Sequence, residues 1–337
     1  MRMSIFCASV TRISDLERLD FGLRELPLEQ WQDGDYVVCR VTVPPGGLRA
    51  VELSSGRLAQ AMDGDVVVGA LGRRAATLEV VGDWRASDGV RLDLMTPAGL
   101  IGRITSQSRF LQPLIQLEYL GHASRGEERL GMGQFVADLD QKEFQLPVVL
   151  IVGTSMSAGK TTTARIVTNR LKAAGRRVVA AKFTGAARYR DILSMRDAGA
   201  ERVCDFVDAG LPSTVCPAEV FRSAVGQMLA ILAAHPADVA VIEAGASPLE
   251  PYNGALAMEL LAPWIRVEIL CASDPYAVAG VVQAFERRPD LVAGGAANTS
   301  AGIGLVQRLT GLEALDLSDP ASYEALDRML RDLLGTP

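Results

Sequence analysis

The residues with the clearest capacity for chemistry lie between positions 148 and 163. Five apolar residues, 148–152, lead into a loop that begins at Gly153 and ends in Gly159-Lys160-Thr161. A buried strand, a glycine-containing loop and a helix in this order form a phosphate-binding site, because backbone N–H groups and the positive end of the helix dipole attract phosphate. Lys160 would reach the terminal phosphates and the Thr161 hydroxyl would bind Mg²⁺. Five residues separate the two glycines where the usual pattern has four, so the match fails by one residue at Gly153.

We predict that the whole loop contacts the nucleotide, and a glycine turn without a ligand is the alternative. The predicted nucleotide-binding residues of the loop are Gly153, Thr154, Ser155, Met156, Ser157, Ala158, Gly159, Lys160, Thr161 and Thr162.

Two more charged residues directly follow apolar runs. Lys182 follows the run that ends at Ala181, and Glu243 follows the run 239–242. The carboxyl ends of parallel strands meet at the ligand-binding edge of a sheet, so both side chains are expected to point at the crevice. Lysine is rare among the 34 basic residues, which makes Lys182 more informative. The alternative for both residues is a charge in water at a strand end.

The second half of the chain alternates short β-rich runs with longer segments of helical spacing. This alternation predicts an α/β fold, a doubly wound, mostly parallel sheet covered by helices on both faces. The predicted strands are 148–152, 177–181, 239–242, 267–270 and 291–292, and the predicted helices are 161–174, 218–234, 277–287, 303–309 and 322–334.

The first part of the chain has short apolar runs separated by glycine-rich and proline-rich turns. Runs at 36–39, 66–68 and 77–81 predict close-spaced strands of a small barrel or sandwich. The stretches 34–38 and 64–68 resemble each other at an offset of 30 residues and are either equivalent strands or a chance similarity. We therefore predict a β-rich N-terminal domain over 1–145 and a nucleotide-binding domain over 146–337.

Composition narrows the function classes. The 337 residues are 49% hydrophobic and carry a formal net charge of −6, so we expect no nucleic-acid partner and no attraction to an anionic membrane. No apolar run is long enough for a transmembrane helix, and the first 15 residues lack a signal-peptide pattern. The five cysteines form no CxxC pair, which is typical of free thiols in a reducing compartment. We expect a cytoplasmic protein.

The spacing from Gly153-Thr154 to Lys160-Thr161 resembles the loop of dethiobiotin synthetase and its P-loop relatives. The resemblance implies that Lys182 helps to bind phosphates and substrate. It also implies that an aspartate shortly afterwards binds metal, for which Asp191 is the candidate and Asp197 the alternative.

Two later motifs extend this resemblance. Glu243-Ala244-Gly245 is similar to the family's Glu-Gly-Ala-Gly, with alanine at the first glycine, and implies that Glu243 is a metal ligand. Asn298, after a late strand, is similar to the asparagine that recognises adenine in that family, although a turn residue is the alternative. The cofactors implied are ATP and Mg²⁺, with the metal held by Thr161, Asp191 and Glu243. A guanine-binding Asn-Lys-x-Asp motif is absent from the sequence.

A β-rich N-terminal domain is no part of dethiobiotin synthetase. The stretch 182–185 followed by 205–214 resembles the P-loop family catalogued as domain of unknown function 1611, which carries an additional N-terminal domain. Weaker candidates for contacts with the substrate are Thr184, Arg188, Arg190, Ser213 and Thr214.

The interpretation is an ATP- and Mg²⁺-dependent P-loop enzyme of ligase or kinase type. Such an enzyme would activate a carboxylate or carbamate of a small-molecule acid substrate, with Lys160 and Lys182 as the catalytic residues. One alternative is a nucleotide-switched ATPase or GTPase that acts on a protein partner, of the metal-insertion or partition type. Another is a binding module whose nucleotide site is inactive. The resemblance implies a homodimer.

Overall fold

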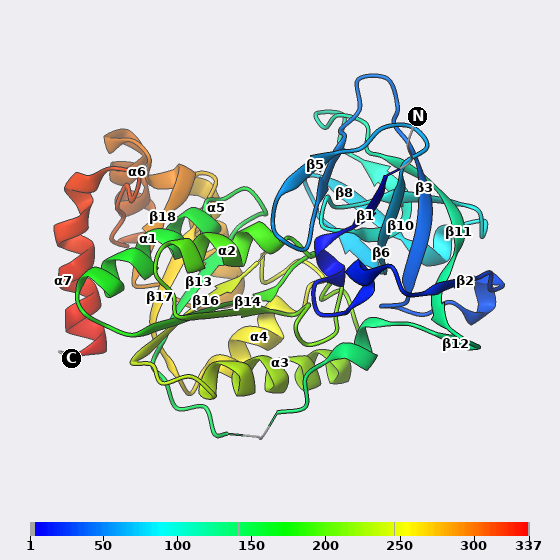
Figure 1. Cartoon of the computed structure of the whole chain (residues 1–337). Helices are drawn as coiled ribbons and strands as arrows, with labels where there is room; N and C mark the ends of the chain where they lie inside the picture. Colours follow the sequence, from blue (N-terminus) through cyan, green and yellow to red (C-terminus); the bar gives the residue numbers. More distant parts are fainter. Residues whose placement is uncertain (1–3, 140–141, 246, 336–337) are drawn as a thin grey trace. The chain divides into compact units, whose positions relative to one another are not determined.

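The computed structural model describes residues 4–139, 142–245 and 247–335. These residues form two compact units (Figure 1). The N-terminal unit contains 1–138 together with two later segments, 186–190 and 206–224, and the C-terminal unit contains 139–185, 191–205 and 225–337. The boundary therefore differs from the predicted division at 145/146, chiefly because these two later segments fold with the β-rich part of the chain.

The N-terminal unit is built on a closed ring of strands. Its ring strands are β3 (Tyr36–Thr42), β6 (Val66–Leu71), β9 (Arg91–Leu94), β10 (Leu100–Gln107) and β11 (Gln116–Arg125). They pair in the order β6-β3-β11-β9-β10, and β10 also pairs with β6, which closes the ring. Alternate side chains point inward, among them those of Val37, Cys39 and Val41. Of the two predicted alternatives, barrel and sandwich, the structure is a small barrel.

Shorter elements surround this barrel. The short strands are β1 (Ile5–Cys7), β2 (Gly22–Arg24), β4 (Ala50–Glu52), β5 (Leu58–Gln60), β7 (Arg73–Ala75), β8 (Val80–Asp83) and β12 (Glu128–Arg129). The predicted strand 77–81 is wrong at its start, because 77–79 form the turn between β7 and β8. Short 3-10 helices, among them η1 (Ser9–Thr11) and η4 (Trp84–Ala86), form some of the remaining connections.

The two similar stretches are structurally equivalent. Gly34 and Gly64 each adopt φ +85°, a left-handed conformation that favours glycine. The N–H of Gly34 donates to the Leu71 carbonyl, and that of Gly64 donates to the Val41 carbonyl. The aspartate after each glycine accepts the N–H of the residue three positions earlier. Since β3 and β6 also pair with each other, the 30-residue offset reflects a pseudo-two-fold pair of strands rather than chance.

The C-terminal unit is organised by a parallel sheet, as predicted. Its strands are β13 (Val148–Gly153), β14 (Val178–Thr184), β15 (Arg202–Asp205), β16 (Val239–Ala244), β17 (Ile265–Cys271) and β18 (Leu291–Ala293). Their order is β15-β14-β16-β13-β17-β18. Every residue of β13, β14 and β16 is buried, as expected for strands covered on both faces. The order places β13 between β16 and β17, so the phosphate-binding loop begins in the middle of the sheet.

Helices cover both faces of this sheet. The helices are α1 (Lys160–Ala173), α2 (Tyr189–Asp197), α3 (Ala218–Ala233), α4 (Gly254–Leu261), α5 (Pro275–Phe285), α6 (Ser300–Thr310) and α7 (Tyr323–Leu334). In Figure 1, α1 lies on one face, and α3 and α4 lie on the other. The five predicted helices are confirmed within a few residues. The elements β15, α2 and α4 were not predicted, because they are short and lack a strong periodic pattern.

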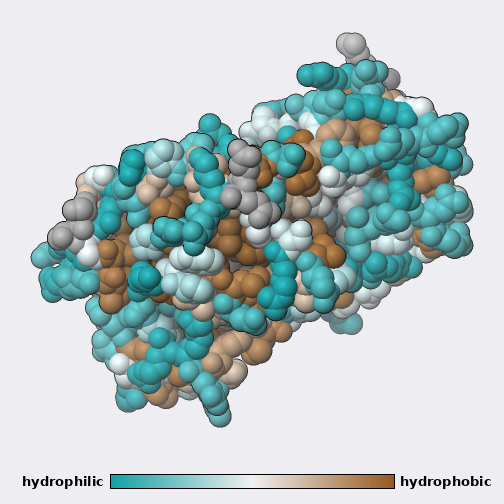
Figure 2. All heavy atoms as spheres, turned by 90° about the horizontal axis from the view of Figure 1, so that it is seen from below, coloured by the Kyte–Doolittle hydropathy of each residue, from teal (hydrophilic) through white to brown (hydrophobic). Residues whose placement is uncertain are grey.

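The surface of the molecule is mixed in character. Figure 2 shows one face on which hydrophilic residues are interspersed with hydrophobic ones. Within the part of the chain that the structure describes, no helix has the length and apolar character that crossing a membrane requires.

Candidate nucleotide-binding site

The loop between β13 and α1 is wrapped around the side chain of Lys160. Gly159 has φ +98°, which a residue with a side chain rarely adopts. The Lys160 side chain is only 3% exposed, and its ammonium donates to the Ser155 carbonyl at 2.5 Å. A Cβ atom at Gly153 would lie 2.7 Å from Cδ of Lys160. A side chain at position 153 would therefore displace the lysine from its path across the loop, although the spacing departs from the usual motif.

Neighbouring strands hold the loop in place. The N–H of Thr154 donates to the carbonyl of Cys271, at the end of β17, at 3.0 Å. The Thr154 hydroxyl accepts the N–H of Ser273 at 3.1 Å. Behind the loop, Gly294 adopts φ +79°, and a Cβ atom there would lie 2.1 Å from the Ala158 carbonyl oxygen. The loop after β18 therefore supports the phosphate-binding loop through direct backbone contact.

Replacing Gly294 with alanine should displace the phosphate-binding loop. The new methyl group cannot occupy the space of the Ala158 carbonyl oxygen, so we expect roughly tenfold or greater loss of nucleotide affinity, which corresponds to about 1.4 kcal/mol. The matched control is Gly304→Ala in α6, where a Cβ atom meets nothing within 4 Å. Titration calorimetry with nucleotide on both variants checks this expectation. Equal affinities in the two variants would show that the contact does not position the loop.

The predicted charged residues converge at the carboxyl ends of β14 and β16. Lys182 is paired in register with Glu243 on the neighbouring strand. The carboxylate of Glu243 accepts the Thr161 hydroxyl, with distances of 3.1 and 3.3 Å to its two oxygens. The Lys182 ammonium donates to Asp191 at 2.5 Å. The structure therefore brings the predicted metal ligands Thr161, Asp191 and Glu243 and both predicted catalytic lysines into one cluster.

Burial sets the electrostatics of this cluster. Glu243 is 2% exposed, and burial raises its pKa above the usual value, with a further increase from the Asp191 carboxylate. Burial also lowers the pKa of Lys160. For Lys182, burial opposes the charged form, but the nearby carboxylates, above all Asp191 and Glu243, hold its pKa above the usual value. The neighbouring carboxylates offset the positive charge of Lys160 only in part. The phosphates of a nucleotide would supply the remaining negative charge.

The donor set fits Mg²⁺. Mg²⁺ prefers hard oxygen ligands and in nucleotide sites uses one or two carboxylates together with phosphate oxygens and water. Thr161, Glu243 and Asp191 offer a hydroxyl and two carboxylates. Within the residues that the structure describes, no group of three or more His, Cys, Asp and Glu side chains is arranged to hold a metal ion alone. A metal here would therefore be bound together with the phosphates of a nucleotide.

A cavity of about 200 Å³ adjoins the loop and could hold the base. Its lining includes Ser157 and Thr162 from the loop region and Asn298 from the segment after β18. The side chain of Asn298 is exposed and therefore accessible to a bound base. Asp316 is another polar residue of this cavity and was not predicted. It follows no apolar run, so no pattern in the sequence pointed to it.

Two further buried carboxylates lie near the lysines. Asp205, at the end of β15, is 1% exposed and is paired in register with Lys182. Glu250 accepts the N–H of Ser247 at 2.6 Å and lies near enough to raise the pKa of Lys160. Asp205 begins the stretch 205–214 that carries the family resemblance, but its place at a strand end was not predicted.

The remaining predicted substrate residues have other surroundings. Thr184 donates its hydroxyl hydrogen to the Gly245 carbonyl at 2.9 Å, which links the ends of β14 and β16. The backbone N–H of Arg190 donates to Glu52 at the start of α2. The others are Arg188, which is exposed, and Ser213 and Thr214, which are buried. All of these except Thr184 belong to the N-terminal unit, so their substrate role stays a prediction. The alternative metal ligand, Asp197, is exposed at the end of α2.

These features define a P-loop NTPase-like fold, a class of proteins that binds nucleotides, usually with Mg²⁺. Residues 135–189 match the family model described as domain of unknown function DUF1611_C, a P-loop domain. The match confirms the sequence-based resemblance to this family over those residues. The resemblance to dethiobiotin synthetase itself stays a prediction. No curated protein matches the sequence.

Several solved structures are similar to this chain. One is a DUF1611 family protein from Anabaena variabilis, with 18% identity and a TM-score of 0.38, covering 58% of this chain and 62% of that chain. Another is the hydrogenase maturation factor HypB from Archaeoglobus fulgidus, with 14% identity and a TM-score of 0.38, covering 56% of this chain and 91% of that chain. A third is chloroplast FtsY from Physcomitrella patens, with 16% identity and a TM-score of 0.36, covering 57% and 67%. The match thus spans less than two thirds of the Anabaena protein, and similarities this low carry no argument about activity.

Proposed function

We propose that the protein is an ATP- and Mg²⁺-dependent enzyme that transfers the γ-phosphoryl group of ATP to an oxygen of a small-molecule carboxylate or carbamate. The observation that supports this proposal is the second buried lysine. Lys182 is 4% exposed and lies beside Glu243, which in turn contacts Thr161 next to Lys160. Simple nucleotide binding needs one such lysine. A second one can neutralise charge on the transferred group and on an anionic acceptor.

In the proposed step, an oxygen of the acid forms a bond to the γ-phosphorus. The bond from the γ-phosphorus to the oxygen that bridges it to the β-phosphate breaks, and ADP leaves with that electron pair. Lys160 and Lys182 hold the phosphoryl oxygens and offset their negative charge, while the backbone N–H groups of the loop position the β-phosphate. When bound, Mg²⁺ would offset charge on the phosphates, held by Thr161, Glu243 and Asp191. In a ligase, a nucleophile would then displace phosphate from the acyl phosphate.

The base cavity supports ATP as the nucleotide. The side-chain amide of Asn298 offers one donor and one acceptor, the pair that the amino group and ring nitrogen of adenine require. We further expect a homodimer in the cytoplasm, with no nucleic-acid or membrane partner, as the sequence analysis indicated.

A hydroxylamine trap tests the proposed reaction. The full-length protein is incubated with Mg²⁺, hydroxylamine and a panel of carboxylic acids, with either ATP or GTP. An acyl phosphate reacts with hydroxylamine to give a hydroxamate, which is detected by its iron complex. We expect hydroxamate with ATP and a subset of acids, together with acid-stimulated ADP release. Turnover that no acid stimulates, combined with nucleotide-dependent association with a protein, would favour the switch alternative, and a preference for GTP would contradict the role of Asn298.

A further inference from the structure

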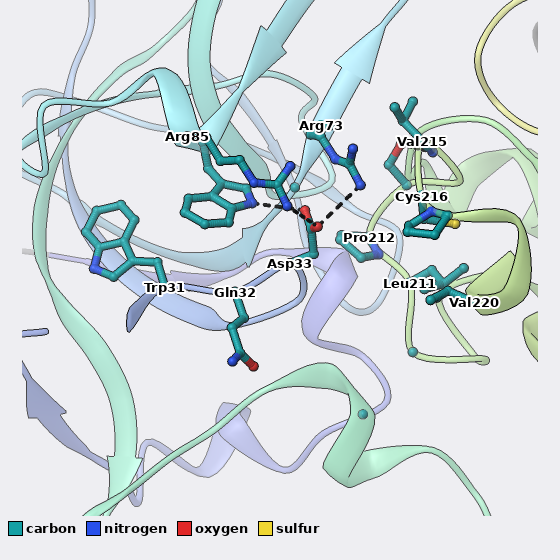
Figure 3. A pocket seen from close by; sticks show the side chains of 16 residues that line it. Trp31, Gln32, Asp33, Arg73, Arg85, Leu211, Pro212, Val215, Cys216 and Val220 are labelled. Carbon is teal, nitrogen blue, oxygen red and sulfur yellow. Dashed lines mark hydrogen bonds and ion pairs between the residues drawn. The ribbon is translucent and has the colours of Figure 1, made fainter. Parts of the chain in front are cut away.

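The N-terminal unit contains a cavity of about 550 Å³ that the nucleotide chemistry does not use. This volume lies within the range of small-molecule pockets. Every residue that lines the cavity belongs to the N-terminal unit, including those contributed by the later segment 206–224. In Figure 3, Trp31 lies on one side and Leu211, Pro212 and Val220 lie on the other, with Asp33 and the arginines between them.

Two arginines and one aspartate supply the charged groups that line this pocket. Arg73 and Arg85 both approach the same carboxylate oxygen of Asp33, at 3.3 and 3.0 Å, and Figure 3 shows both guanidinium groups turned toward it. Among the described residues of the lining only these three are charged, and Arg85 also lies 3.7 Å from Asp83, which is outside the lining. Burial raises the pKa of Cys216, another lining residue, to about 11, so its thiol is neutral at pH 7.

Asp33 itself cannot satisfy two guanidinium groups. Its other oxygen already accepts the indole N–H of Trp84 at 2.9 Å. Nε of Arg73 is buried and has no hydrogen-bond partner within the described residues. In the equivalent turn of the repeat, Asp63 instead accepts the backbone N–H of Val43 at 2.7 Å. The aspartate of one turn is thus used to hold the backbone, whereas Asp33 orients two arginines at a cavity.

The rest of the lining is mainly apolar and rigid. Trp31 is 3% exposed and is held by ring contacts with Tyr119 and Trp84, so its ring forms a fixed wall. Opposite it, Pro212 is buried, Leu211 is half-buried and Val220 is exposed. Such walls favour a ligand with an apolar body, while the guanidinium groups favour a planar anionic head.

We propose that this pocket binds a monocarboxylic acid with an aromatic or aliphatic body. The carboxylate would accept hydrogen bonds from Arg73 and Arg85, because the guanidinium fork matches its geometry. A dianion such as a phosphate monoester is disfavoured, since Asp33 and Asp83 already offset the positive charge of the two arginines and would repel the second negative charge. The site stands on the pocket alone and is independent of the proposed phosphoryl transfer.

Calorimetric titration of the full-length chain in the absence of nucleotide tests this site. The probes are benzoate, 3-phenylpropanoate, hexanoate and octanoate, with 3-phenylpropanamide as the neutral analogue and phenyl phosphate as the dianion. We expect saturable binding of at least one acid. The amide and the phosphate should bind at least roughly tenfold more weakly than that acid. Omitting nucleotide separates the failure of this site from the failure of the proposed reaction.

Three variants locate the binding. Arg85→Gln should weaken binding of the acid by roughly tenfold or more. Its side chain is 49% exposed, so the fold should tolerate the change. Val220→Asp should weaken binding of the acid, which the new carboxylate would repel, but not binding of the neutral amide. The control is Arg40→Gln, which removes an exposed arginine that pairs with Glu118 outside the pocket. Equal affinity for acid and amide, unchanged affinity in Arg85→Gln, or no saturable binding of any acid at millimolar concentration would overturn the proposal.

Discussion

Replacing Lys160 with alanine should abolish nucleotide hydrolysis and most of the stabilisation that nucleotide confers. The lysine side chain fills the loop, crosses Gly153 and is the charged group that a phosphate would meet there. Losing one such preorganised donor typically lowers turnover by about 100- to 1000-fold. In the wild type, nucleotide at about 100 times its Kd should add roughly 2.7 kcal/mol of stability, or about 5–10 °C in Tm.

The unliganded variant should remain folded. Burial lowers the pKa of Lys160, which means that folding is opposed by the charge of this ammonium, so its removal takes away an unfavourable contribution. Lys172→Ala is the matched control, because Lys172 lies near the end of the same helix and pairs with Glu201 at the surface. Thermal melts and phosphate-release assays on both variants measure the effect. Hydrolysis retained in Lys160→Ala would remove the basis of the nucleotide site.

Replacing Glu243 with glutamine should lower nucleotide hydrolysis by about 100-fold or more, as the loss of a catalytic electrostatic group does. The amide oxygen can still accept the Thr161 hydroxyl, so the local packing is kept while the negative charge is lost. We expect the Mg²⁺-dependent part of nucleotide stabilisation to disappear and the part measured with a chelator to remain. Because burial raises the pKa of Glu243, the Tm of the unliganded variant should be no lower than that of the wild type.

A second buried glutamate of the same sheet provides the control. Glu268 on β17 is also buried, and burial raises its pKa, but it pairs with Arg287 at 2.7 Å. Glu268→Gln should leave both turnover and the Mg²⁺-dependent stabilisation unchanged, because this carboxylate pairs with Arg287 and not with Thr161. Melts with nucleotide, with and without Mg²⁺, distinguish the two variants. If both variants lose the Mg²⁺-dependent stabilisation, or neither does, Glu243 is not the metal ligand.

Much of the nucleotide site could be predicted because it is local in the sequence. The loop and the first turn of α1 are contiguous in the sequence. Apolar runs predicted the strands that end near Lys182 and Glu243. The direction of parallel strands then placed these two side chains at one edge, and the structure pairs them in register. Asp191 was predicted through a family resemblance, and the structure pairs it with Lys182, whereas Asp197 is exposed.

Residues that act through non-local contacts were harder to find. Asp205 lies at the end of a four-residue strand that is too short to show a period, and Asp316 lies in a loop. The segment around Tyr189 could not be assigned to the N-terminal unit, because the decisive contact is Glu52, whose carboxylate accepts the N–H of Tyr189 at 2.8 Å. Asp208 likewise pairs with Arg12 at 2.7 Å, nearly 200 positions earlier in the chain.

The sequence by itself determined the parallel sheet, the phosphate-binding loop and the charged residues at its strand ends, because short-range periodicity and strand direction specify them. Only the tertiary structure decided that two segments of the second half fold with the barrel and that the 34–38 and 64–68 stretches form a symmetric pair. It alone revealed the pocket around Asp33, Arg73 and Arg85. These features depend on which distant residues exclude water together, and that information is not carried by the spacing of residues along the chain.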